Sequence, residues 1–225
     1  MKTPKPILLA GTSLALALAT PAVAQDLYVQ GFAGYTFADN ANFAGVIGGA
    51  PQSVFSDFED GYNIGGSVGL KFAPSGSSVG FRGEVELSFG ENDIDALNFT
   101  GNGPGFEVNV GGDVSATFLL VNGFIDFDTG SKLTPYLGGG IGVGFVDIDL
   151  IYGPGVVITG NDEVFAAQLI AGVSYEVGAN TSIFGDVRYI QAYDVQGTRV
   201  SPGGAALVSD DLSRTALNVG VRFDF

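Results

Sequence analysis

The 225-residue chain contains no cysteine and no histidine, and these two absences exclude several kinds of chemistry. Without cysteine the chain forms no disulfide and no thiolate site, and without histidine it forms no Ser-His-Asp triad and no histidine-ligated metal centre. Carboxylate pairs such as Asp93 with Asp95 and Asp147 with Asp149 could carry acid–base chemistry, but carboxylates in such polar segments are usually solvated. We therefore expect no enzyme, no cofactor and no dedicated metal site.

Basic residues and long apolar runs are also scarce. The chain has nine lysines and arginines against 24 aspartates and glutamates, so it offers no basic surface for the phosphates of a nucleic acid. Its first apolar stretch, residues 7–19, is shorter than the ~20 residues that a spanning helix needs. Glycine and polar residues interrupt every later run, which excludes a helical membrane protein.

The N-terminus has the pattern of a secretory signal peptide. Lys2 and Lys5 precede the apolar stretch, and the small-residue sequence "PAVA" ends at Ala24. We expect cleavage after residue 24, which leaves one domain over residues 25–225. That domain keeps seven basic and 24 acidic residues, so its formal charge is −17.

The sequence is rich in glycine and in segments where apolar and polar residues strictly alternate. There are 36 glycines, whereas charged residues make up only 15% of the chain. In the stretch "VGFRGEVELSFG" (79–90), apolar residues alternate with Arg82, Glu84 and Glu86, which is the pattern of a strand with two different faces. Eight segments alternate in this way, at about 27–38, 62–73, 79–90, 114–127, 135–147, 164–177, 182–194 and 213–225.

The connections between these segments alternate in length. Those after the second, fourth and sixth segments are short and turn-like: "PSGSS", "DTGSKL" and "GANT". The other four run to about 15–24 residues and hold 16 of the 24 acidic residues. Short turns at one end and long loops at the other are typical of an outer-membrane barrel.

The alternation leaves two orientations open. In a soluble barrel or sandwich the charged face meets water, whereas in a membrane barrel the apolar face meets lipid and the charges are enclosed. The polar faces here consist mainly of glycine and serine, which suit a narrow interior, and lipid tolerates no unpaired strand edge. We therefore predict an all-β fold: an eight-stranded antiparallel up-and-down transmembrane β-barrel with short periplasmic turns and long extracellular loops.

The inward faces carry charges of both signs toward the short-turn end. Opposite charges in a confined lumen can pair, and an unpaired one costs several kcal/mol. The alternative is a solvated face whose charges contact only water. We predict a lumen ion-pair network that closes the periplasmic half and consists of Lys71, Arg82, Glu84, Glu86, Asp126, Glu176, Asp186, Arg188, Arg222 and Asp224.

The glycine row from Gly138 to Gly144 has two interpretations. It either leaves space for larger side chains opposite, as in a narrow barrel, or marks a flexible or bulged strand. The row is not a phosphate-binding loop, because it lacks both the G-x-G-x-x-G spacing and a following helix.

With the strands placed, the chain resembles the small outer-membrane β-barrel family of Gram-negative bacteria. The resemblance is to the outer membrane protein A and X type, and especially to porin-like single-domain surface proteins of alphaproteobacteria. It is carried by segments such as "LYVQGFAGYTF" (27–37), "FRGEVELSF" (81–89), "TPYLGGGIGVGF" (134–145) and "LNVGVRFDF" (217–225). The resemblance implies an assembly signal, read by the barrel-assembly machinery, at Val219, Val221, Phe223 and Phe225.

Two functions agree with this interpretation, and a third requires the reverse orientation of every strand. The first is a structural or surface role in the outer membrane, with a mostly closed lumen and exposed acidic loops. The alternative is a small diffusion porin for hydrophilic solutes, and a further one is a secreted soluble β-barrel that binds a ligand in an apolar interior. For the first two we expect outer-membrane lipid as the environment, a monomer, and weak binding of divalent cations at the acidic loops.

Overall fold

The computed structural model describes residues 27–47, 50–72, 78–99, 106–107, 110–152, 156–201 and 204–225, so the expected signal peptide lies outside the described residues. Within these ranges the chain forms strands and short turns, and no helix there is long and apolar enough to cross a membrane. The strands are β1 (Leu27–Ala38), β2 (Ala41–Ile47), β3 (Ala50–Phe58), β4 (Gly61–Phe72), β5 (Val79–Phe99), β6 (Phe106–Glu107), β7 (Val110–Phe127), β8 (Leu133–Tyr152), β9 (Val156–Gly178), β10 (Thr181–Ser201) and β11 (Gly204–Asp224).

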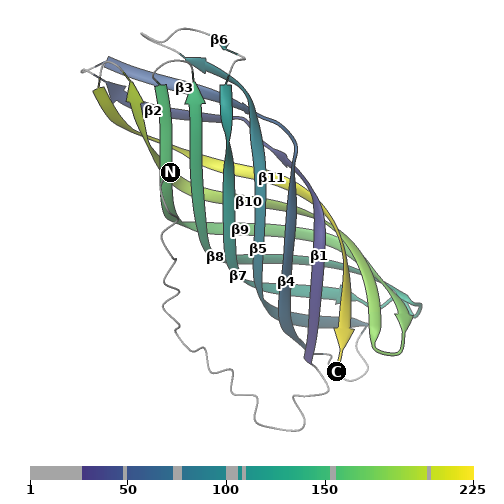
Figure 1. The fold of residues 1–225 in the computed structure, drawn as a ribbon. Helices are drawn as coiled ribbons and strands as arrows, with labels where there is room; N and C mark the ends of the chain where they lie inside the picture. Colours follow the sequence, from purple (N-terminus) through teal and green to yellow (C-terminus); the bar gives the residue numbers. More distant parts are fainter. Residues whose placement is uncertain are drawn as a thin grey trace, which may run out of the picture.

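Eight of these strands close into a ring (Figure 1). The order around the ring is β1–β4–β5–β7–β8–β9–β10–β11, and every neighbouring pair is antiparallel. β1 completes the ring by pairing with β11, from Tyr28 opposite Asp224 to Ala38 opposite Arg214. The predicted eight-stranded barrel is confirmed, and its wall has no free edge where lipid would leave backbone groups unpaired.

The strands extend further than the sequence pattern predicts. β5 continues to Phe99 instead of ending near residue 90, β8 continues to Tyr152 and β10 to Ser201. Alternation persists in these extensions, but its polarity is reversed: Asp93 and Asp95 face outward while Ile94 and Ala96 are buried inside. Large parts of the connections that the sequence suggested as long loops therefore continue the barrel wall.

The hairpin β2–β3 also belongs to the wall. It lies between β11 and β5, pairing through Ala44 with Ser209 on one side and through Ser56 with Leu97 on the other. Two-residue breaks at Asp39 and Asn40 and at Glu59 and Asp60 separate it from β1 and β4. Figure 1 shows the hairpin at the end of the barrel opposite the C-terminus, so it lengthens the ring without adding strands to it.

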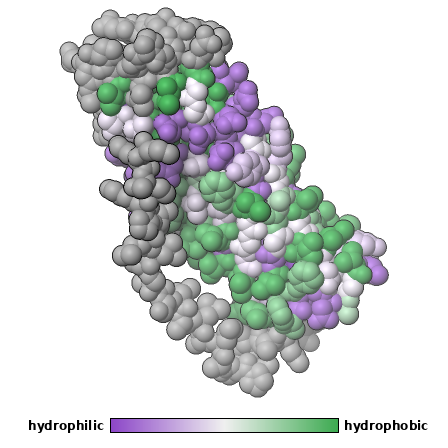
Figure 2. Space-filling view, in the orientation of Figure 1, coloured by the Kyte–Doolittle hydropathy of each residue, from purple (hydrophilic) through white to green (hydrophobic). Residues whose placement is uncertain are grey.

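The outer surface is divided into two zones (Figure 2). On the face that Figure 2 shows, apolar side chains cover much of the lower part of the barrel. Exposed apolar residues of the membrane segments include Ile141, Leu169 and Val219. Above this apolar band the same face is hydrophilic. Acidic residues of the strand extensions such as Asp93, Asp147 and Asp149 are exposed on the outer surface. An apolar band above the periplasmic turns is the surface that a bilayer covers.

Large inward side chains of β7 lie over the glycines of β8. Phe124 is paired with Gly138, and Phe118 with Gly144. A Cβ added at Gly138 would overlap the Phe124 ring, and one at Gly144 would lie 2.8 Å from Phe118 Cε1. The glycine row therefore provides space for the larger groups opposite, which was the first of the two interpretations.

We expect the substitution Gly138→Ala to destabilise the barrel by about 1–3 kcal/mol, because the new methyl group forces the Phe124 ring to move in a packed lumen. Gly123→Ala is the matched control, since Gly123 is exposed and has no atom within 4 Å of an added Cβ. Urea unfolding of the mature protein in detergent micelles measures both changes. Equal midpoints for the two variants would contradict this packing account.

Candidate functional site in the barrel lumen

The lower lumen is lined by polar side chains from almost every strand of the ring. Arg82, Glu84 and Glu86 occupy alternate positions of β5, so all three point inward, and their exposures are 3%, 3% and 0%. Phe81 and Leu87 of the same strand are exposed on the outer face. Charges as deeply buried as these are tolerated only where other groups pair with them or donate hydrogen bonds to them.

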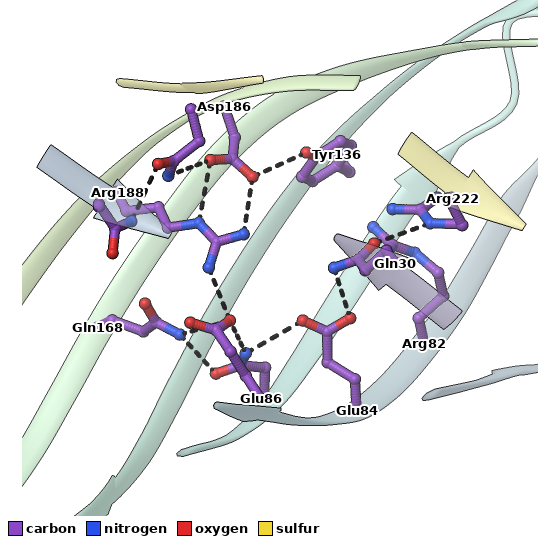
Figure 3. Close-up of polar contacts among 12 residues, drawn as sticks. Gln30, Arg82, Glu84, Glu86, Tyr136, Gln168, Asp186, Arg188 and Arg222 are labelled. Carbon is purple, nitrogen blue, oxygen red and sulfur yellow. Dashed lines mark hydrogen bonds and ion pairs between the residues drawn. The ribbon is translucent and has the colours of Figure 1, made fainter. Parts of the chain in front are cut away.

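Arg188 joins two carboxylates from opposite sides of the lumen (Figure 3). Its Nη1 atom donates to Glu86 Oε2 at 2.7 Å, while Nε and Nη2 donate to the two carboxylate oxygens of Asp186 at 3.0 and 3.1 Å. Glu86 lies on β5 and Arg188 on β10, and these strands are diametrically opposite in the ring. The ion pair therefore crosses the whole width of the barrel.

Arg82 forms a second ion pair nearer the periplasmic end. Its Nε atom donates to Asp126 Oδ2 at 2.6 Å, and its guanidinium lies 4.3 Å from the ring centroid of Phe124 and 5.0 Å from that of Tyr136. Cations over aromatic faces are attracted by the ring quadrupole, and the attraction is stronger where water is excluded. Arg82 is thus held both by a carboxylate and by two rings.

Glu84 is satisfied by neutral donors instead of a cation. Tyr28 Oη donates to it at 2.7 Å, Gln30 Nε2 at 3.0 Å and Asn122 Nδ2 at 3.2 Å. Asn122 also donates to Glu86 Oε2 at 2.8 Å, so one amide connects both carboxylates. The network therefore includes neutral side chains as well as charged ones.

The sequence prediction missed these neutral members because it counted only charges. Tyr28, Gln30, Asn122 and Gln168 all occupy inward positions in the alternation, and this signal could have identified them. Gln168 donates to Asn122 Oδ1 at 2.8 Å, which links β9 to β7.

The remaining predicted members lie near the periplasmic opening. Lys71 Nζ and Asp224 Oδ1 are 2.6 Å apart in a partly exposed ion pair. Arg222 has no ion pair among the described residues; its Nε atom donates to Gln30 Oε1 at 3.0 Å, and its guanidinium lies 5.1 Å from the Tyr28 ring centroid. Glu176 is exposed and forms no ion pair within the described ranges. The structure thus brings seven of the ten predicted residues into four ion pairs.

The four residues of the predicted assembly signal lie on the outer face of the last strand and at the end of the chain. Val219, Val221 and Phe223 alternate along β11 and are exposed toward the apolar band. Phe225 is also exposed, and its backbone N–H donates to Leu27 O at 3.0 Å, which ties the C-terminus to β1. Their recognition by the assembly machinery stays a prediction.

The interior above the polar network is mainly apolar, although buried polar side chains such as Asn92, Arg199 and Arg214 also lie there. Side chains from the upper parts of the long strands, including their extensions, and from the hairpin β2–β3 pack together there, and almost no solvent reaches them. The largest of these fully buried residues are Phe43, Val54, Leu97, Leu120, Val146, Leu150, Ile158, Ile190 and Val195.

The outer face of the extensions carries closely spaced carboxylates. Asp93, Asp113 and Asp149 are directly opposite one another on three neighbouring strands. Partial burial and the negative charges of Asp149, Asp93 and Asp147 raise the pKa of Asp113. In the part of the chain that the structure describes, no group of three or more acidic side chains is placed to hold a metal ion. The expected cation binding therefore has no preformed metal centre there.

A closed antiparallel ring with an apolar outer band and a charged lumen defines a transmembrane β-barrel. The sequence model described as "Outer membrane protein beta-barrel domain" matches residues 8–225, so the chain belongs to this family of Gram-negative outer-membrane proteins. The protein is therefore located in the outer membrane.

Known proteins resemble the chain in sequence and in fold. It is 30% identical over 173 residues to outer membrane protein PagN of Salmonella typhimurium, a match that spans 75% of this chain and 65% of PagN. The fold resembles outer membrane protein OprG of Pseudomonas aeruginosa with a TM-score of 0.59 and 14% identity, covering 90% of this chain and 97% of OprG.

A further structural neighbour is an enzyme. Outer membrane protease OmpT of Escherichia coli matches with a TM-score of 0.50 and 8% identity, covering 90% of this chain and 97% of OmpT. At such low identity the likeness shows a shared fold alone, so it transfers no activity to this chain.

We expect the substitution Arg188→Met to destabilise the barrel by about 3–5 kcal/mol, because it leaves Glu86 and Asp186 buried without their cation. Lys71→Met is the matched control: it breaks an ion pair that is partly exposed, so we expect a loss below about 1 kcal/mol. Urea unfolding followed by tryptic protection measures both. A larger loss for Lys71→Met than for Arg188→Met would refute this ranking of the two pairs.

Removing one charge from the carboxylate row should stabilise the barrel at neutral pH. The pKa of Asp113 is raised in the folded state, so the folded protein binds this proton more tightly than the unfolded chain does. The contribution of Asp113 to the free energy of unfolding is therefore largest below the pKa of the carboxyl group in the unfolded chain. This contribution is lost as the pH rises through the higher pKa of the folded state. Asp113→Asn should raise the urea midpoint at pH 7 and lose this advantage below about pH 4.

Glu163→Gln provides the control for this pH effect. Glu163 is also exposed on the strand extensions, but its neighbour in the register is Phe145 and not a carboxylate. An equal stabilisation by both variants would show that net charge, and not the row, is responsible. Salt near 1 M should remove most of the Asp113 effect, because it screens exposed charges.

Proposed function

We propose that this protein is a structural surface barrel: it spans the outer membrane with a closed lumen and supports a rigid acidic wall above the bilayer. The observation that carries the proposal is the ion pair from Glu86 to Arg188, which crosses the lumen with both side chains only 1% exposed. A hydrated pore at this level would expose these groups to water.

The apolar layer above the network supports the same conclusion. Phe43, Leu97 and Leu150 belong to one buried apolar cluster inside the upper barrel and have almost no solvent-accessible surface. A hydrated ion that passed the polar network would next have to cross an apolar constriction, which excludes water. Two barriers of different chemistry therefore lie in series along the lumen.

The outward acidic belt supports a role at the cell surface. Carboxylates such as Asp93, Asp113 and Asp149 project from paired strands, so their spacing is fixed by the wall. Anionic outer-leaflet lipids beside such a belt require bridging cations, and we propose that divalent cations bind there weakly and without a defined centre. We further propose that the protein is a monomer, is not an enzyme, loses residues 1–24 on export and is assembled through its last strand.

Single-channel conductance of the refolded mature protein in a planar bilayer tests this function. A heat-modifiable shift on a gel first establishes that the barrel has closed. We expect no steady current from the wild-type protein, and we expect Arg188→Ala to remain silent because the apolar layer is intact. The double variant Arg188→Ala/Leu120→Ser weakens both barriers and should open a small conductance.

A steady conductance from folded wild-type protein would assign the function to the alternative, a small diffusion porin. Failure to insert into the bilayer would contradict both membrane functions. Gly123→Ala serves as the control for handling and refolding, because its added methyl group lies on the outer face with no neighbour within 4 Å.

A further inference from the structure

Two charged members of the predicted network line one cavity at the periplasmic opening and stay unpaired. Arg222 on β11 forms no ion pair with a described carboxylate, and Glu176 on β9 forms none with a described cation. The cavity that both residues line has a volume of about 110 Å³. It therefore holds one unpaired charge of each sign.

The guanidinium of Arg222 is held in place by its surroundings. Its Nε atom donates to Gln30 Oε1 at 3.0 Å (Figure 3), and its Cζ atom lies 5.1 Å from the ring centroid of Tyr28 and 5.5 Å from that of Phe184. Although Arg222 is only 4% exposed, its Nη1 and Nη2 atoms are not fully enclosed, and no described residue accepts a hydrogen bond from them. These two donors are available to an oxygen atom in the cavity.

Glu176 faces the same cavity from the other side of β10. The strand register pairs Arg222 with Ser182 and Ser182 with Glu176, so the three residues form one row across β11, β10 and β9. Tyr175 and Val177 are exposed on the outer face, so alternation directs Glu176 inward. Strands are about 4.8 Å apart, so roughly 10 Å separates the backbones of Arg222 and Glu176. The two charged groups leave a gap between them.

The rest of the lining is polar and balanced in charge. Lys71 pairs with Asp224, and Asp126 accepts from Arg82 behind the cavity. The uncharged polar residues of the lining are Thr134, Ser174, Thr181 and Ser182. A simple anion would meet carboxylates beside Arg222, and a simple cation would meet the guanidinium beside Glu176. The lining therefore favours a molecule that carries both charges.

We propose that this cavity is a binding site for a small zwitterion of about the size of glycine. The ligand carboxylate accepts from Nη1 and Nη2 of Arg222, and the ligand ammonium donates to the carboxylate of Glu176. One water needs roughly 10–15 Å³ of such a volume, so the cavity has room for the few heavy atoms of glycine. Charge-assisted hydrogen bonds of about 2.7–2.9 Å at both ends let one such molecule bridge the gap.

The position of the site makes it a receptor and not a pore. The ion pairs of Arg82 and Arg188 fill the lumen above the cavity. A zwitterion therefore enters from the periplasm, binds at the opening and leaves by the same route.

The side-chain NMR signals of arginine test the site directly. The refolded mature protein is labelled with ¹⁵N-arginine and held in octyl glucoside micelles, because zwitterionic detergent head groups would compete. Glycine is titrated at pH 7 against sodium acetate and methylammonium chloride at equal ionic strength. We expect the Nε signal of Arg222 to shift saturably with glycine, while that of Arg188 stays in place. No shift up to 100 mM glycine, or an equal shift with acetate or methylammonium, overturns the proposal.

The substitution Glu176→Gln tests the second contact of the ligand. Glu176 is exposed and forms no ion pair within the described ranges, so the variant should fold like the wild type. We expect at least tenfold weaker glycine binding and several-fold stronger acetate binding, because the carboxylate that attracts the ammonium and repels an anion is gone. Unchanged glycine affinity would refute the site, even if Arg222→Met failed to fold.

Glu163→Gln is the matched control for this variant. It removes the same charge from an exposed residue that does not line the cavity, so glycine affinity should not change. Equal weakening in both variants would show that net charge is responsible and would overturn the proposal.

The spacing of the ligand charges tests the two-point contact. In 6-aminohexanoate the ammonium and carboxylate groups are separated by a long alkyl chain, which exceeds the cavity between Arg222 and Glu176. We expect this compound to bind at least tenfold more weakly than glycine. Equal affinity for the two compounds would contradict the proposed bridge.

Discussion

The pairing of β1 with β11 is the constraint on which the rest of the structure depends. It converts an open sheet into a ring, so every strand has two neighbours in the region where lipid replaces water. A ring of only eight strands encloses a lumen that side chains can fill. Because the apolar faces are turned to lipid, the charged faces are forced together inside. Ion pairs such as that between Glu86 and Arg188 are therefore consequences of closure.

Each long strand passes through two environments and changes its polarity between them. In the apolar band Leu87 of β5 faces outward and Glu86 inward, whereas in the extension Asp93 faces outward and Ile94 inward. The lower half is organised like a membrane protein and the upper half like a soluble barrel with an apolar core. The two orientations that the sequence left open are thus both present, one above the other in the same wall.

Much of the fold could be predicted from alternation, because the period-two pattern survives in each membrane segment. The strand extensions could not be predicted in this way. Their outward residues, such as Asp93 and Asp95, are acidic, and a segment without an apolar outer face was interpreted as a loop. A bulge near Asp194, whose φ is 53°, also shifts the register of β10 without a clear sequence signal. The wall is consequently longer than the pattern indicates.

For the candidate site, the sequence predicted which residues point into the lumen better than it predicted which of them pair with each other. Alternation identified Arg82 and Arg188 as inward residues, but which carboxylate each meets depends on strand register and on the stagger of the ring. The alternation also placed Arg214 on the inward face of the last strand, where the structure buries it, but the predicted network did not include it.

The change of polarity along the wall fixes how deep the molecule sits in its bilayer. Sinking by a few ångströms would draw outward carboxylates such as Asp147 and Asp149 into hydrocarbon, and rising would bring apolar residues at the upper edge of the band, such as Phe145 and Phe165, into water. Either displacement costs free energy, so thickness differences have to be absorbed by the lipid. The barrel is therefore expected to set the hydrophobic thickness of the lipid immediately around it.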